Sequence, residues 1–132
     1  MTQTKIMFVG ERRSDTAKRK GWTWRDGRLA AKTLFEALRG ISVDPLAQEF
    51  CNLYPDEPRP LEVTDHRKRR LREIARTDVK IVALGRKVSD GLAELGIEHV
   101  AIVHPAARGW IRGRGRYAAH VREVLGLALG VA

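Results

Sequence analysis

Residues 79–84 read VKIVAL and are followed by Gly85, and this stretch decides the fold class. It is a short, continuous apolar run, which is typical of a strand buried on both of its faces. Residues 5–9 read KIMFV and form a second run of this kind, which stops at Gly10. Because strands buried on both faces belong to parallel sheets covered by helices, the two runs predict an α/β fold.

Further strand and helix signals alternate around these two runs. Residues 47–53 and 98–103 are expected to be strands, and residues 11–27 a long polar loop. Helices are expected in four places: from Asp26 or Gly27 to Gly40, from Thr64 or Asp65 to about Arg76, over residues 87–95 and over residues 116–129. The βα-βα-βα-βα order predicts a single domain over residues 1–132, with three α/β/α layers and a four-stranded parallel sheet. Ligands of such sheets bind beyond the carboxyl ends of the strands.

Positive charge dominates the composition. Of 132 residues, 25 are Lys or Arg and 16 are Asp or Glu, which gives a formal net charge of +9. A field of this sign suits nucleic acids, polyphosphates and anionic membranes. No apolar run approaches the length of a membrane span, and the N-terminus has no apolar signal region. We therefore expect a cytoplasmic protein with no membrane partner.

The chain offers few residues for a metal or an iron–sulfur cluster. Its one cysteine, Cys51, can form neither an internal disulfide nor, alone, a zinc or cluster site. No pair of histidines has the spacing of metal ligands. We expect no metal and no cofactor.

Polar residues lie at the carboxyl ends of three of the predicted strands. Gly10 lets the backbone approach a ligand closely, and Glu11 can orient water or act as a base. A salt bridge from Glu11 to a neighbouring arginine is an equally good interpretation. Asn52 carries a donor and an acceptor on one plane, which suits a base edge, although a turn is the commoner role for asparagine. His104, held extended by Pro105, can donate a hydrogen bond to a leaving group.

Aromatic and basic residues gather in two loops. Trp22 and Trp24 lie among cations in the first loop, where such rings either stack on a nucleobase or close the core. We expect Trp24 to be the stacking residue. In the second loop, residues 108–116 read RGWIRGRGR, and Trp110 with Ile111 is expected to wedge into a base stack or to cover a partner surface. The arginines expected to contact nucleic acid are Arg12, Arg13, Arg108, Arg112 and Arg114.

Taken together, these segments resemble the uracil-DNA glycosylase superfamily. Residues 5–11, KIMFVGE, look like the first motif of the branch whose first loop opens Gly-Glu. Residues 81–86, IVALGR, are similar to the third strand of that branch, and residues 104–107, HPAA, to its His-Pro motif. The resemblance covers nearly the whole chain in order. Each motif is short, so its specificity comes from order and spacing.

The resemblance implies a uracil-DNA glycosylase-like fold and a monomeric DNA glycosylase acting in DNA repair or modified-DNA metabolism. Such an enzyme flips a nucleotide out of duplex or single-stranded DNA and hydrolyses the N-glycosidic bond of uracil or another modified pyrimidine. Glu11 matches the acid that positions the water, and His104 matches the histidine that stabilises the departing base anion. Asn52 matches the asparagine that reads the pyrimidine edge, and Trp24 falls near the aromatic residue that stacks on the base. Residues 108–112 fall where the family inserts its wedge loop.

The chain departs from the family in two respects. Relatives carry a small, turn-forming stretch after the glutamate, where this chain has Arg12-Arg13-Ser14. That change predicts a base that differs from uracil or is larger, or a phosphate nearby. Relatives of this branch usually hold an iron–sulfur cluster on four cysteines, which a chain with one cysteine lacks. Two alternatives stay open: a non-catalytic DNA-binding or damage-sensing module on the same fold, and an enzyme that processes hypermodified bases in DNA.

Overall fold

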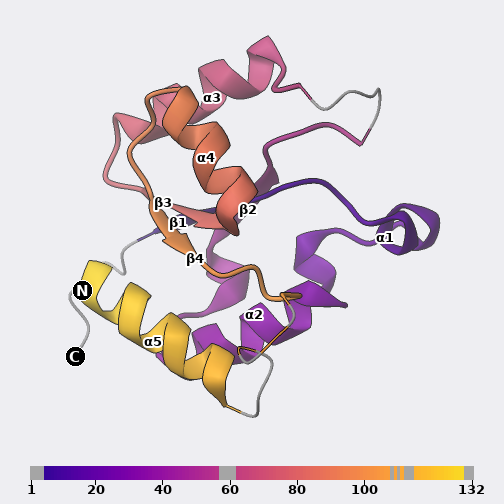
Figure 1. Cartoon of the computed structure of the whole chain (residues 1–132), viewed down its shortest axis with the longest axis vertical. Helices are drawn as coiled ribbons and strands as arrows, with labels where there is room; N and C mark the ends of the chain where they lie inside the picture. Colours follow the sequence, from indigo (N-terminus) through magenta and orange to yellow (C-terminus); the bar gives the residue numbers. More distant parts are fainter. Residues whose placement is uncertain (1–4, 57–61, 108, 110, 112–114, 130–132) are drawn as a thin grey trace.

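Figure 1 shows the computed structural model of the chain, in which four strands form one parallel sheet. The structure describes residues 5–56, 62–107, 109, 111 and 115–129. The strands are β1 (Ile6–Gly10), β2 (Glu49–Asn52), β3 (Lys80–Leu84) and β4 (Val100–Ile102), in the order β2-β1-β3-β4 across the sheet. The predicted α/β class and four-stranded parallel sheet are confirmed.

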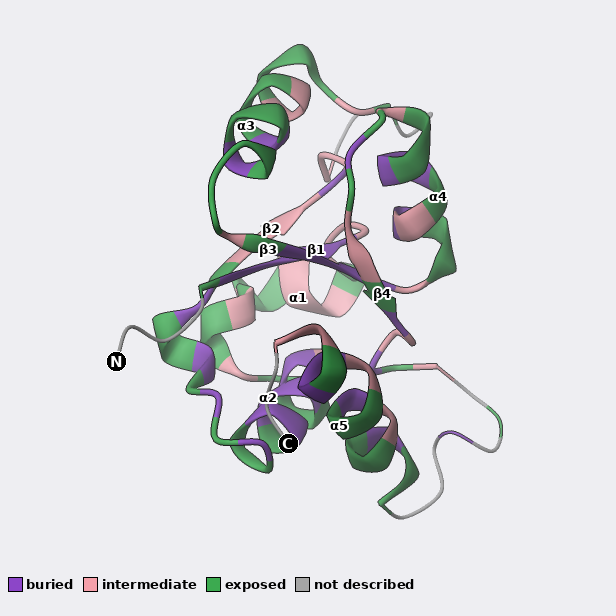
Figure 2. Ribbon diagram, turned by 90° about the vertical axis from the view of Figure 1, so that its left-hand side faces the viewer, coloured by how far each residue is buried: buried purple, intermediate pink, exposed green. Residues whose placement is uncertain are grey.

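Helices cover both faces of this sheet, as Figure 2 shows. On one face lie α2 (Ala30–Arg39) and α5 (Arg116–Ala128), and on the other lie α3 (Asp65–Ala75) and α4 (Arg86–Glu94). Side chains of a strand point alternately to its two faces. Ile6 and Phe8 of β1 accordingly join the core under α2 and α5, whereas Met7 and Val9 join the core under α3 and α4. The predicted three-layer arrangement is therefore confirmed.

The first loop contains more structure than its polar sequence predicts. Residues 15–20 form helix α1 (Asp15–Lys20), and a 3-10 turn, η1 (Trp24–Asp26), follows. The hydroxyl of Ser14 accepts the N–H of Ala17 at 3.1 Å, which caps the start of α1, and Gly21 ends it in the left-handed conformation. The prediction that residues 11–27 form a loop without helices is wrong because local capping outweighs the polar composition.

The start of α2 also differs from its prediction. The helix begins at Ala30 rather than at residue 26 or 27, because Gly27 and Leu29 both have positive φ angles, 63° and 56°. The remaining predicted helices and strands are present, with ends that shift by a few residues. Thr64 caps α3 as expected, since its hydroxyl accepts the N–H of Arg67 at 3.1 Å. In the part of the chain that the structure describes, no helix has the length and apolarity to cross a bilayer.

The strand order reverses between β1 and β3. From β1 the chain runs outward to β2, and it then returns to build β3 and β4 on the other side. In parallel sheets the loops on either side of such a reversal leave a crevice at the carboxyl ends of the strands. The loop after β1, the end of β2 and the loop after β4 therefore meet at this edge of the sheet.

Candidate functional site

A cavity of about 380 Å³ lies at the carboxyl edge of the sheet. Asn52 from the end of β2 and His104 from the loop after β4 both line it. Trp24, Arg12 and Arg13 from the loop after β1 complete its polar and aromatic lining. Five residues singled out in the sequence thus surround one cavity, although they are far apart along the chain.

Trp24 and Asn52 form a hydrogen-bonded pair in the wall of this cavity. The indole Nε1 of Trp24 donates to Oδ1 of Asn52 at 3.0 Å. The Trp24 ring also stacks on Phe50, with ring centroids 5.8 Å apart and 17° between the ring planes. The hydrogen bond fixes the orientation of the amide, because only an oxygen can accept from the indole N–H. The NH₂ of Asn52 is therefore the group left to donate to a ligand.

Gly10 makes this close packing possible. A Cβ atom at Gly10 would lie 2.7 Å from Oδ1 of Asn52 and 2.7 Å from a carbon of the Trp24 ring. The expectation that a ligand approaches the backbone at Gly10 therefore needs correction, because two side chains of the protein occupy that space. Gly10 shapes the cavity by letting Trp24 and Asn52 meet.

His104 is held in one neutral form. Its Nδ1 accepts the N–H of Ala106 at 3.0 Å, so the ring proton of the neutral imidazole resides on Nε2. Burial lowers the pKa of His104 below the ordinary histidine value, and the carboxylate of Glu11 partly opposes this shift. Gly85, at φ 97°, lets the side chain pack closely, since a Cβ there would lie 3.3 Å from Cβ of His104. The result is a neutral imidazole with a single N–H donor.

Glu11 is engaged in an ion pair beside the cavity. Its carboxylate lies 2.9 Å from Nζ of Lys87, a residue in the first turn of α4. The salt-bridge interpretation of Glu11 is thus correct in kind, but the partner is a lysine from a distant segment rather than a neighbouring arginine. Glu11 does not line the cavity, although its carboxylate is near enough to influence the pKa of His104. The sequence gives no signal for Lys87, because this contact depends on the order of the strands.

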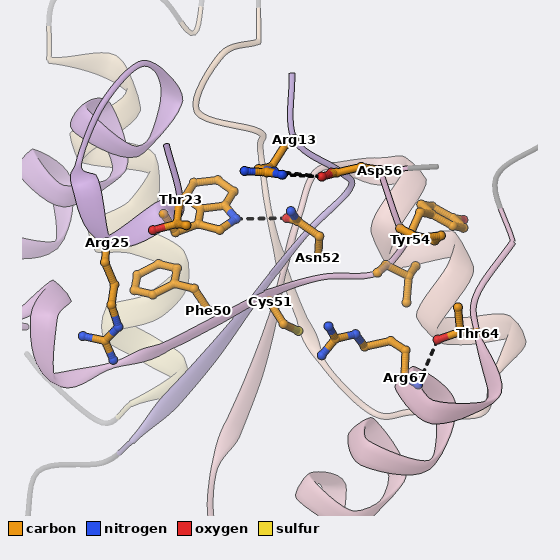
Figure 3. Close-up of a pocket in the computed structure, with 13 residues that line it drawn as sticks. Arg13, Thr23, Arg25, Phe50, Cys51, Asn52, Tyr54, Asp56, Thr64 and Arg67 are labelled. Carbon is orange, nitrogen blue, oxygen red and sulfur yellow. Dashed lines mark hydrogen bonds and ion pairs between the residues drawn. The ribbon is translucent and has the colours of Figure 1, made fainter. Parts of the chain in front are cut away.

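Arg13 ties two loops together. Its Nε and Nη2 donate to Oδ2 of Asp56 at 2.9 and 2.6 Å (Figure 3), which joins the loop after β1 to the segment after β2. The guanidinium holds the pKa of the Asp56 carboxyl below its usual value, chiefly through these hydrogen bonds. A DNA contact by Arg13 stays a prediction, and in this structure its guanidinium pairs with a carboxylate.

The predicted wedge is wrong for Ile111. Its side chain is only 6% exposed and belongs to the core between α2, α5 and the sheet. An apolar side chain in an arginine-rich loop gains more from burial than from exposure, and here the fold offers it a place. The other residues expected in the wedge loop lie outside the described residues: Arg108, Trp110, Arg112 and Arg114.

Trp22, together with Arg28 and Leu29, which the sequence did not single out, extends the cavity beyond His104 and Asn52. Trp22 and Arg28 line it together, with the Arg28 guanidinium 5.6 Å from the centre of the Trp22 ring. Leu29 also lines it and is 51% exposed. The sequence left open whether Trp22 packs in the core or stacks on a base. The structure places it in the cavity wall.

A second cavity of about 410 Å³ follows the outer edge of β2 (Figure 3). Cys51 and Arg67 line it, and burial raises the pKa of the Cys51 thiol. Trp24 and Asn52 line both cavities. The hydrogen-bonded pair therefore contributes to the walls of both cavities.

Comparison of the sequence with protein-family models and with curated proteins finds no match. The resemblance to uracil-DNA glycosylases thus rests on the sequence motifs alone. Among the described residues, no group of three or more His, Cys, Asp or Glu side chains is placed to hold a metal ion.

Proposed function

We propose that this chain is a DNA glycosylase, which binds a flipped pyrimidine in the cavity and hydrolyses its N-glycosidic bond. One observation carries the proposal: Asn52 and His104 offer N–H donors to the same cavity, while their acceptor atoms are bonded within the protein. No Asp or Glu is among the described residues that line this cavity. A site of this kind favours a ligand that accepts hydrogen bonds and becomes negatively charged.

The departing base has those properties. When the bond between the sugar carbon and the base nitrogen breaks, the bonding electrons leave with the base and the sugar acquires positive character. The Nε2–H of His104 stabilises the negative oxygen of the base, and a neutral imidazole donates without giving up its proton. The low pKa of His104 keeps the imidazole neutral near pH 7.

Glu11 supplies the complementary role on the sugar side. Its carboxylate stabilises the cationic sugar and accepts a proton from the water whose oxygen adds to the sugar carbon. Lys87 pairs with that carboxylate at 2.9 Å and so helps to fix its position. Flipping the nucleotide costs a few kcal/mol, and contacts between DNA phosphates and this chain, of net charge +9, offset that cost.

The test is release of free base from oligonucleotides that contain uracil or a panel of modified pyrimidines. Abasic sites are then revealed by alkaline cleavage, and mass spectrometry distinguishes an abasic sugar from a base altered in place. His104→Ala should lower the rate by about 100-fold or more, because it removes an N–H aimed at developing charge. His66→Ala, on the exposed surface of α3, is the matched control. Intact DNA binding with no release from any substrate contradicts the proposal.

A second candidate is a non-catalytic DNA-binding module on the same fold. It is favoured by the ion pair of Glu11, which keeps the proposed catalytic carboxylate off the cavity lining. Glu11→Gln separates the two candidates, since a glycosylase should lose rate far more than affinity. Binding that depends on salt, with no turnover by the wild-type chain, supports the module instead.

A further inference from the structure

Three consecutive charged residues in the loop after β1 differ in how they are paired. Glu11 is paired with Lys87 at 2.9 Å, and Arg13 with Asp56 at 2.6 Å. Arg12, between them, forms no hydrogen bond or ion pair in the part of the chain that the structure describes. Both of its neighbours are held by the fold, so Arg12 is the member of the trio that remains available.

The position of Arg12 is energetically unfavourable for a cation that has no partner. It lines the cavity, and its Nη1 atom is shielded from solvent without any hydrogen-bond partner. A charged N–H that loses its water without gaining an acceptor is unfavourable. No carboxylate lines the cavity among the described residues, so the protein itself provides no anion for Arg12 there. An anion brought by a ligand would satisfy it.

We infer that Arg12 binds an anionic oxygen group of the ligand, either a carboxylate on the base or a phosphate of the DNA strand. This inference rests on the proposed function, because it concerns the same cavity. The guanidinium matches both groups, since its planar fork of N–H donors pairs with two oxygens at once. Nη1 is buried without an acceptor in the structure, so an anion in the cavity can supply the missing one.

The size and charge of the cavity agree with a ligand larger than a bare pyrimidine ring. A volume of about 380 Å³ falls within the roughly 300–1,000 Å³ range of pockets that hold whole small molecules. The cation of Arg28 lines the same space, where it lies over Trp22. The cavity thus combines an uncompensated positive charge with room beyond the base-reading groups.

The experiment measures binding by fluorescence anisotropy on three single-stranded oligonucleotides that differ at one position. That position carries deoxyuridine, its 5-carboxy derivative or the neutral 5-carboxamide. The variant is Arg12→Gln. The matched control is Arg19→Gln, which removes the same charge from an exposed position of α1 outside the cavity. Arg12→Lys keeps the charge but loses the fork, and it serves as a second variant should the glutamine variant fold poorly.

If Arg12 reads a carboxylate on the base, the wild-type chain should bind the 5-carboxy strand about tenfold more tightly than the carboxamide strand. Arg12→Gln should abolish that preference, and Arg12→Lys should retain only part of it. If Arg12 binds a strand phosphate, Arg12→Gln should weaken binding to all three strands alike. The slope of log K against log salt should then fall by about 0.7.

The inference is overturned if Arg12→Gln, or Arg12→Lys in its place, behaves like Arg19→Gln on all three strands. Base release, measured in parallel, separates this failure from failure of the proposed function. Release that does not depend on Arg12 leaves the glycosylase proposal standing without the anion site. Binding that depends on Arg12 without release from any strand leaves the anion site standing without the glycosylase.

Discussion

Nε1 of Trp24 lies 3.0 Å from Oδ1 of Asn52, and this hydrogen bond joins the first loop to the end of β2. Asn52 was expected to read a base with both its donor and its acceptor. With one lone pair of Oδ1 engaged by Trp24, the amide keeps a fixed orientation and presents its NH₂ to the cavity. The indole that was expected to stack on the base therefore also sets which edge of Asn52 faces the ligand.

Trp24→Phe tests this relationship. The variant keeps an aromatic ring on Phe50 but removes the N–H, so Oδ1 of Asn52 is left without its donor. We expect the free energy of unfolding, measured in urea, to fall by about 1 kcal/mol. The base-release panel should also show weaker discrimination between pyrimidines, because the amide can then rotate. Trp22→Phe is the control, and equal effects of the two changes would contradict a specific role for the Trp24 N–H.

Gly10→Ala should disrupt the same pair by steric clash. The added Cβ would lie 2.7 Å from both Oδ1 of Asn52 and the Trp24 ring, closer than such atoms approach. We expect a loss of roughly 1–3 kcal/mol in the free energy of unfolding and a red shift of tryptophan fluorescence as the ring moves. Gly40→Ala, at a helix-like φ of −64°, is the comparison and should change both readouts far less. Unchanged fluorescence in Gly10→Ala would argue against the packing described here.

The pH dependence of base release should report His104. Its pKa lies below the ordinary value of 6.5, chiefly because of burial, so the neutral donor is present at pH 7. The single-turnover rate should be flat above pH 6.5 and fall only at lower pH, as the imidazole gains a proton. An acid limb centred above the ordinary histidine value would be incompatible with this account.

The free energy of unfolding should also depend on the protonation of His104 and, like the rate, should fall at low pH. The unfolded chain protonates His104 at the ordinary value of 6.5, whereas the folded chain resists protonation until a lower pH. The free energy of unfolding therefore declines as the pH falls from 6.5 toward the folded pKa. His104→Gln should remove this slope, and His66→Gln should leave it. Denaturant unfolding at several pH values measures both.

Leu29 has a backbone conformation that favours glycine. Its φ of 56° and ψ of −128°, together with the hydrogen bond from the Ala31 N–H to the Arg28 oxygen at 3.1 Å, form a tight turn before α2. A leucine in this region is strained, by on the order of 1–3 kcal/mol. Leu29→Gly should therefore raise the free energy of unfolding by about 1 kcal/mol, once the greater freedom of glycine in the unfolded chain is subtracted.

Leu46→Gly is the control for that substitution. Leu46 is 52% exposed, nearly the same as Leu29 at 51%, but its φ is not positive. The same replacement there should lower stability or leave it unchanged, because glycine relieves no strain. Chemical denaturation of both variants gives the comparison, and destabilisation of Leu29→Gly by as much as Leu46→Gly would show that the turn is not strained.

The fold class followed from patterns that are local in the sequence. The runs at residues 79–84 and 5–9 predict strands buried on both faces, and the alternation with helix signals predicts a parallel sheet. Helix α1 was missed although its signals are present. Ser14 before Asp15 marks its start and Gly21 marks its end, but the basic residues between them have no apolar stripe. A short helix that is stabilised by its caps cannot be predicted from hydrophobic periodicity.

The sequence predicted where the site residues lie in the fold better than it predicted which residues they contact. The amino-acid sequence alone determined that Asn52 and His104 lie at the ends of strands, and that parallel strands carry such residues to one edge of the sheet. Only the tertiary structure decided that Glu11 meets Lys87, that Trp24 bonds Asn52 and that Ile111 is buried. Strand propensity and capping act over a few neighbouring residues, so the sequence reveals them directly. Contacts between loops depend on strand order and on packing between distant segments, which no local pattern records.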